Sequence, residues 1–80
     1  MAVNIRQDVA ENLKVGVGVL YDYEPGKRIA GAVEVFTPTG LRENGLCIYH
    51  LHIRSAGRPV EVLHQFRVRA DQPITIITEG

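Results

Sequence analysis

Residues 13–23 read Leu-Lys-Val-Gly-Val-Gly-Val-Leu-Tyr-Asp-Tyr, and every odd-numbered position in this stretch carries an apolar or aromatic side chain. Successive side chains of a β-strand point to opposite faces, so this two-residue repeat predicts a strand with one buried face. The repeat ends before Pro25-Gly26, a dipeptide that is typical of turns. The stretch therefore indicates a β-protein.

After this turn, residues 28–37 show the same repeat and predict a second strand. A loop of three residues (25–27) would pair Val19 with Val33 and would bring the apolar faces of both strands to the same side. The following residues, 38–45, are rich in polar and turn-forming side chains, and we expect a surface loop there. Loops of this kind often carry binding groups.

Residues 46–54 and 60–69 predict a third and a fourth strand, joined by a short loop at 55–58. A loop of even length pairs His52 with Glu61 and makes one face of this hairpin apolar. The opposite face collects mostly polar and charged side chains: Ile48, His50, His52, Arg54, Glu61, Leu63, Gln65, Arg67 and Arg69.

Upstream of the first strand, residues 4–14 predict a short amphipathic helix. Asn4 is a suitable N-cap, and Gln7 follows it at the spacing of a capping box. Apolar residues recur at every fourth position and form one stripe: Ile5, Val9 and Leu13.

These segments predict a single α+β domain over residues 1–80, mainly β. A short N-terminal helix is followed by a four- or five-stranded antiparallel meander, either an open sheet or a small barrel. The last run, residues 74–78, reads Ile-Thr-Ile-Ile-Thr and would attract other chains if it were an uncovered edge. Because an 80-residue core is small and the one cysteine excludes an intrachain disulfide, we expect a homo-oligomer that covers this strand.

The balanced net charge does not by itself point to a ligand class. The chain has 9 Lys+Arg and 9 Asp+Glu, so its net charge does not indicate binding to nucleic acid or to an anionic membrane. The N-terminus lacks the pattern of a secretory signal, and the longest apolar stretch, 15–21, is too short to span a bilayer. A lone cysteine fits a reducing compartment, and we expect a cytoplasmic protein without membrane association.

His50 and His52 are two residues apart, so both imidazoles project from the same face of the third strand. The expected register adds Glu61 opposite His52, which would make a weak candidate for a two-histidine, one-carboxylate metal site. The alternative without a metal is a polar strand face on which His52 and Glu61 form an ordinary cross-strand pair. We favour this alternative and expect neither a metal nor another cofactor.

No catalytic residue is predicted. His64 falls on the apolar face beside Tyr49, where a hydrogen-bonded core histidine is the usual case. Cys47 is expected to behave as a small hydrophobic residue, and Ser55 lies in a turn without the pattern of a triad. Gly16-Val17-Gly18 lacks the third glycine of a dinucleotide-binding fingerprint.

Arginine supplies seven of the nine basic residues. Arg54, Arg67 and Arg69 share the polar face with His50 and His52, and the planar guanidinium suits phosphate and carboxylate groups. These five residues are the candidate binding site for an anion or nucleotide. Alternating arginines are also common on the solvated side of a sheet.

Two functions follow as expectations. The favoured one is a small non-enzymatic homo-oligomeric accessory protein that binds a protein partner through its exposed strand face and the 38–45 loop. The alternative is an arginine-lined oligomer that binds a phosphate-bearing ligand, a nucleotide or nucleic acid. An enzyme is the weakest class because no constellation of catalytic groups is recognisable.

Overall fold

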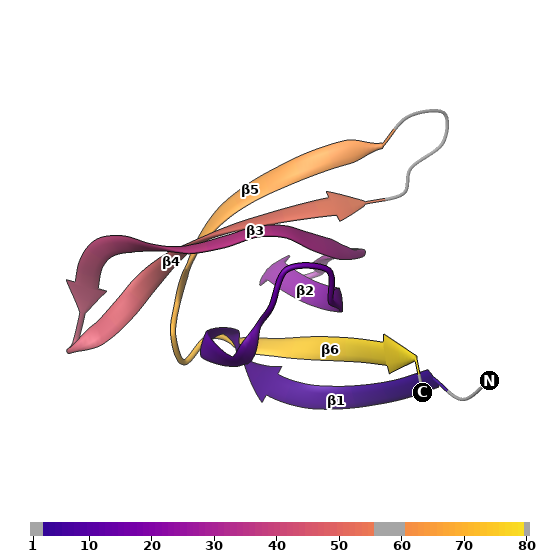
Figure 1. Cartoon of the computed structure of the whole chain (residues 1–80), viewed down its shortest axis with the longest axis horizontal. Coiled ribbons are helices and arrows are strands. Elements are labelled where there is room, and N and C mark those ends of the chain that lie inside the picture. Colours follow the sequence, from indigo (N-terminus) through magenta and orange to yellow (C-terminus); the bar gives the residue numbers. More distant parts are fainter. Residues whose placement is uncertain (1–2, 56–60, 80) are drawn as a thin grey trace.

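The structure, a computed structural model, describes residues 3–55 and 61–79 of the chain. It contains six strands and one turn of 3-10 helix: β1 (Val3–Val9), η1 (Ala10–Asn12), β2 (Gly18–Glu24), β3 (Lys27–Glu43), β4 (Leu46–Ser55), β5 (Val62–Arg69) and β6 (Pro73–Glu79). The strands form one antiparallel open sheet in the order β1-β6-β2-β3-β4-β5 (Figure 1). The prediction of a mainly β antiparallel fold is confirmed.

The predicted N-terminal helix is wrong. Residues 3–9 form strand β1, which pairs with β6 over seven residue pairs from Val3–Glu79 to Val9–Pro73. A short helix is only marginally stable by itself, whereas β-branched residues suit a strand that completes a sheet. The expected apolar stripe splits accordingly: Leu13 is buried in the core, while Ile5 is exposed on the sheet.

Strand β6 lies inside the sheet, between β1 and β2, so it is not the uncovered edge that the sequence suggested. Its residue Ile76 pairs with Arg6 of β1 on one side and with Val19 of β2 on the other. Each chain therefore covers this apolar strand by itself. The two edges of the sheet are instead β1 and β5.

The β2–β3 hairpin has a tighter turn than predicted. Glu24 pairs with Lys27 across Pro25-Gly26, and a bulge at Tyr23 shifts the register so that Val19 pairs with Gly31, not with Val33. The apolar residues still reach one face, because the bulge supplies the extra residue that the shorter loop lacks.

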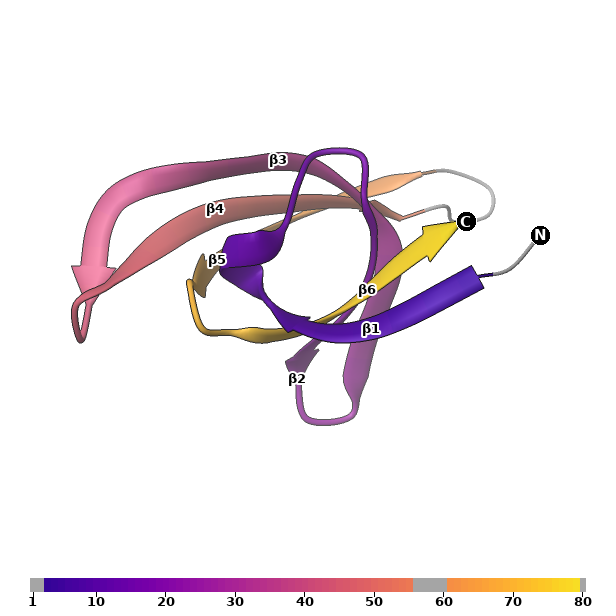
Figure 2. The same cartoon turned by 60° about the horizontal axis from the view of Figure 1, so that its bottom comes forward.

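The predicted loop at 38–45 is also wrong, because β3 continues through it to Glu43. Asn44 and Gly45 both adopt left-handed backbone conformations, with φ of 51° and 78°, and make the tight turn into β4. Asn-Gly is the preferred pair for such hairpin turns. The Thr39 hydroxyl donates to the Ile48 carbonyl oxygen at 2.7 Å and holds the irregular part of β3 against β4. Figure 2 shows this end of the hairpin extending away from the rest of the sheet.

The sheet curls on itself (Figure 2), and the residues inside the curl form one hydrophobic core. The buried residues come from β2 to β6 and from the segment around η1: Ala10, Leu13, Val19, Tyr21, Val33, Leu51, Ile53, Val68, Ala70, Ile74 and Ile76. The 3-10 turn covers one end of the curl, where the Ala10 N–H donates to the Gln72 carbonyl and the Glu11 N–H to that of Ala70. We call the opposite side of the sheet the outer face.

Gly31 of β3 lies directly against the backbone of β4. A β-carbon at this position would clash with the backbone carbonyl of Arg54 and would lie 2.9 Å from Cγ2 of Ile53. Because the carbonyl belongs to the β4 backbone, the clash cannot be relieved by a side-chain rotation.

We expect Gly31→Ala to lower the free energy of unfolding by about 1–3 kcal/mol, as overpacking of a closely packed site does. Urea denaturation followed by circular dichroism measures this change. Ala30→Ser, at the exposed neighbouring position of the same strand, is the control and should leave the midpoint almost unchanged. A Gly31→Ala midpoint equal to that of the wild type would contradict this account.

Candidate functional site

The polar outer face of β4 and β5 has the predicted composition but a different register. His50 pairs with Arg67, and His52 pairs with Gln65, which is four residues away from the predicted partner, Glu61. Because four is an even number, the same side chains share a face as in the prediction. Only their neighbours across the hairpin differ.

The register removes the weak metal candidate. His52 lies opposite the amide of Gln65, and Glu61 instead contacts Arg54 at 3.3 Å. Within residues 3–55 and 61–79, no group of three or more His, Cys, Asp and Glu side chains is arranged to hold a metal ion. The three residues His50, His52 and Glu61 are therefore not brought together.

Two of the three predicted anion-binding arginines are already engaged by carboxylates. Arg54 lies 3.0 Å from Glu34 and 3.3 Å from Glu61. The hydrogen bond from Arg54, together with its charge, lowers the pKa of Glu34 below the ordinary 4.5. At the other end of the face, Arg69 makes two contacts with Asp71, at 2.5 and 2.9 Å.

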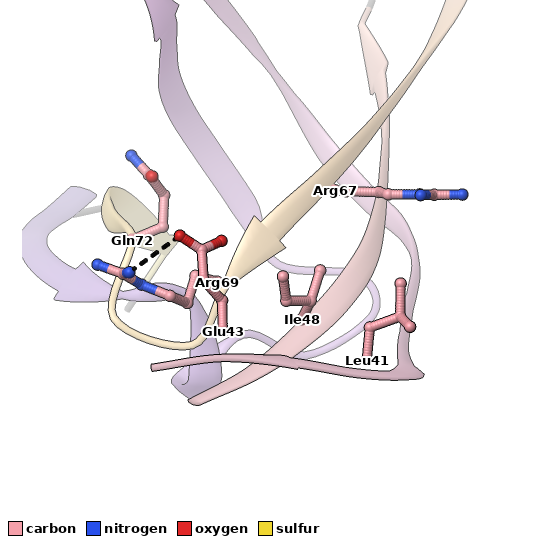
Figure 3. A pocket seen from close by; sticks show the side chains of 6 residues that line it. All are labelled: Leu41, Glu43, Ile48, Arg67, Arg69 and Gln72. Carbon is pink, nitrogen blue, oxygen red and sulfur yellow. Dashed lines mark hydrogen bonds and ion pairs between the residues drawn. The ribbon is translucent and has the colours of Figure 1, made fainter. Parts of the chain in front are cut away.

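Arg69 also lies 3.5 Å from Glu43, and Figure 3 shows this ion pair at one side of a hollow. The hydrogen bond from Arg69 and its charge lower the pKa of Asp71 below the ordinary 3.8. Arg54 and Arg69 thus hold local carboxylates in the ionised form, and their own positive charges are balanced within the chain.

Arg67 differs from both neighbours. Within the described part of the chain, no carboxylate lies within 4.0 Å of its guanidinium. In Figure 3 its side chain extends away from the Arg69–Glu43 ion pair. An open hollow of about 250 Å³ lies next to it and is lined by His50, His52, Gln65, Phe66 and Arg67. Three of the five predicted site residues, His50, His52 and Arg67, therefore share one hollow.

A contact between Ser55 and His64 was missed by the sequence analysis. The Ser55 hydroxyl lies 3.1 Å from Nε2 of His64, and the same hydroxyl donates to the Val62 carbonyl at 3.3 Å. Ser55 belongs to the end of β4, not to the turn, and this places it diagonally across from His64. His64 is hydrogen-bonded, as predicted, but it is half-buried and does not belong to the core.

This Ser–His pair does not make a catalytic site by itself. In the residues that the structure describes, no acidic side chain hydrogen-bonds the His64 ring, and its neighbour is the ring of Phe66, stacked at a centroid distance of 6.3 Å. A serine nucleophile needs an oriented base and donors for the oxyanion. The Ser55 hydroxyl instead donates a hydrogen bond to the Val62 carbonyl at the end of the β4–β5 pairing.

Cys47 and the two tyrosines of β2 occupy structural positions. Cys47 is a free, half-buried thiol whose Sγ lies 3.6 Å from the Ile48 carbonyl oxygen. Tyr21 and Tyr23 pack against Phe66 with ring centroids 5.0 and 5.5 Å away, which explains their place on the inner face. Burial raises the pKa of the Tyr21 hydroxyl above 10.0.

Comparisons with known proteins do not place this chain in a family: no family model, no curated protein and no solved structure matches it. Among the described residues, none of the helical structure is long and apolar enough to cross a bilayer.

The charge balance at Arg54 can be tested by titration. We expect Arg54→Gln to raise the pKa of Glu34 toward its ordinary 4.5, because both the hydrogen bond and the positive charge are lost. Since the pKa is lowered in the folded state, this pair stabilises the fold above pH 4.5, and its contribution is lost as the pH falls through the folded-state pKa. NMR titration of the side-chain carboxyl carbons measures the shift.

Arg28→Gln is the matched control for this titration. It removes the partner that lowers the pKa of Asp22, so the Asp22 pKa should rise while that of Glu34 stays constant. A Glu34 pKa that is the same in the wild type and in Arg54→Gln would show that this ion pair does not form in solution.

Proposed function

We propose that this protein is a non-enzymatic, self-associating module that binds a protein partner, and that its first interface joins two copies through strand β1. The observation that carries the proposal is the bare edge of β1. On this strand, Ile5 is 66% exposed and Val3 is 57% exposed, although both side chains are apolar. An open strand edge with apolar side chains favours pairing with another strand.

The apolar side chains of β1 continue a row on the outer face. Ile5 pairs with Ile77 of β6, and Ile77 pairs with Gly18 of β2. A hollow of about 450 Å³, lined by Gly16, Val17, Gly18, Ile77 and Thr78, lies beside this row. Exposed apolar surface of this kind is typical of an interaction site.

The charges of β1 support a second copy as the occupant. Arg6 and Asp8 are two residues apart, 3.1 Å from each other, and have opposite signs. When two identical strands pair antiparallel around a twofold axis at Gln7, each Arg6 faces the Asp8 of the other copy. The same register places Ile5 opposite Val9, so the polar and the apolar pairs match together. Twofold pairing of identical patches is also the commonest symmetry of homo-oligomers.

Strand β5 is the other edge and is protected differently. Arg67 and Arg69 occupy its C-terminal half, and charged residues discourage edge-to-edge association. Its N-terminal residues Val62 and Leu63 are 44% and 39% exposed. In a β1-linked dimer the two β5 strands would stand at opposite ends of one continuous sheet. We propose these ends, with their exposed Val62 and Leu63, as the surface for the protein partner.

A dimer in solution is the first expected result. Size-exclusion chromatography with light scattering should give the mass of two chains, and Ile5→Lys should shift the protein toward the mass of one. Leu41→Lys is the control: Leu41 is 54% exposed, but it lies on β3, an interior strand, so this variant should remain dimeric.

A charge exchange tests the register of the pairing. Arg6→Asp places two carboxylates opposite each other and should weaken the dimer, as like charges across strands do. Combining Arg6→Asp with Asp8→Arg restores opposite charges and should recover the dimer. A wild-type protein that is monomeric at all concentrations would contradict the proposed self-association. If Ile5→Lys remains a dimer, the interface lies elsewhere.

A further inference from the structure

The outer face of β4 and β5 has a central section of hydrogen-bond donors without a balancing carboxylate. His50 lies between Thr37 of β3 and Arg67 of β5, and the next row places His52 between Val35 and Gln65. Directly opposed residues on neighbouring strands have β-carbons about 5 Å apart, and diagonal neighbours lie about 7–8 Å apart. The side chains of His50, His52, Gln65 and Arg67 can thus reach one point.

Ion pairs lie at both ends of this section. On one side Arg54 is held by Glu34 and Glu61, and on the other Arg69 is held by Asp71 and Glu43. The acidic groups nearest to the section are therefore already occupied. Arg67 remains, and it lines the open hollow that it shares with the two histidines.

Arg67 also borders a second hollow of different chemistry. This one has a volume of about 460 Å³ and is lined by Leu41, Glu43, Ile48, Arg67, Arg69 and Gln72 (Figure 3). Leu41 and Ile48 form its apolar part, while the carboxylate of Glu43 is held against Arg69. One arginine thus separates a hollow lined by donors from a hollow with an apolar wall.

We propose that this surface binds a small organic phosphate monoester. Arg67, His50 and His52 hydrogen-bond the phosphate, and the organic part of the ligand packs against Ile48 and Leu41. The guanidinium supplies paired donors that match two phosphate oxygens, and the imidazoles and the Gln65 amide supply donors for the remaining one. The site is independent of the β1 interface, which lies at the other edge of the sheet.

A phosphate fits this arrangement better than a carboxylate. A carboxylate has two acceptor oxygens, and the Arg67 guanidinium can engage both in one bidentate pair. A phosphate monoester has three terminal oxygens and a charge of about −1.5 to −2 at neutral pH. Donors from four side chains on two strands match the larger number of acceptors.

NMR spectroscopy of the uniformly ¹⁵N-labelled full chain tests the proposal, with phenyl phosphate and inorganic phosphate as separate probes. Both should cause saturable shifts centred on the amides of His50, His52, Gln65 and Arg67, and phenyl phosphate should also shift Ile48 and Leu41. Arg67→Gln should weaken the affinity for both by about tenfold or more, which corresponds to the loss of charged hydrogen bonds. Benzoate should bind more weakly than phenyl phosphate.

Two variants serve as controls. Arg28→Gln removes an arginine that is paired with Asp22 on the β2–β3 hairpin, so it should leave the affinity unchanged. Ile48→Ser should weaken phenyl phosphate more than inorganic phosphate. The spectrum of Arg67→Gln without ligand shows whether that variant is folded; if it is not, Arg67→Lys, which retains the charge but not the planar fork, replaces it and should also weaken binding.

Three results would overturn the site: no saturable shift with either phosphate, shifts that map elsewhere on the sheet, or equal affinity in Arg67→Gln and the wild type. Equal affinity for the two phosphates would overturn the role of Ile48 and Leu41. Light scattering of the same samples reports the dimer separately, so a failure of one proposal is distinguishable from a failure of the other.

Discussion

The fold depends on the insertion of β6 between β1 and β2. This last strand follows β5 in the chain but pairs with two strands from the N-terminal part of the sequence. Its Ile74 and Ile76 are buried in the core, and burial of such a side chain contributes about 1.5–3 kcal/mol. Without β6, the strand β1 would lose the one strand that it pairs with among the described residues. The two edges, and therefore the surfaces open to other molecules, follow from this one insertion.

The two-residue repeat in the sequence predicts many of the side chains that lie in the core, although Val15, in the same repeat, precedes β2 and is 65% exposed. Val19, Val33, Leu51 and Ile53 all lie in the core, as their alternation indicates. It does not predict partners, because every register that differs by an even number of residues buries the same set. The β2–β3 hairpin shows the physical reason: its two-residue turn and the bulge at Tyr23 together shift the pairing by an even number of residues, so the buried face stays the same.

Where the predicted element type is wrong, long-range pairing outweighs a local signal. Residues 4–14 have the cap and the stripe of a helix, but the open side of β6 offers a complete ladder to a strand at this position. The same applies to residues 38–45, whose polar composition indicates a loop. There the Asn44-Gly45 turn allows β3 and β4 to extend as a hairpin, and a strand can remain polar because both of its faces are accessible to solvent at this end.

The register also decides the chemistry of the outer face. The sequence alternation places His50, His52 and the three arginines on one face, and the structure brings three of these five into one hollow. A register four residues away would have set a carboxylate opposite His52 and would have favoured a cation. The actual register places an amide there and moves Glu61 to Arg54. The same set of residues thereby changes from a site with acceptor groups to one of donors, which suits an anion. Side-chain alternation can locate such a surface, but only the pairing of the strands determines the sign of the charge that it attracts.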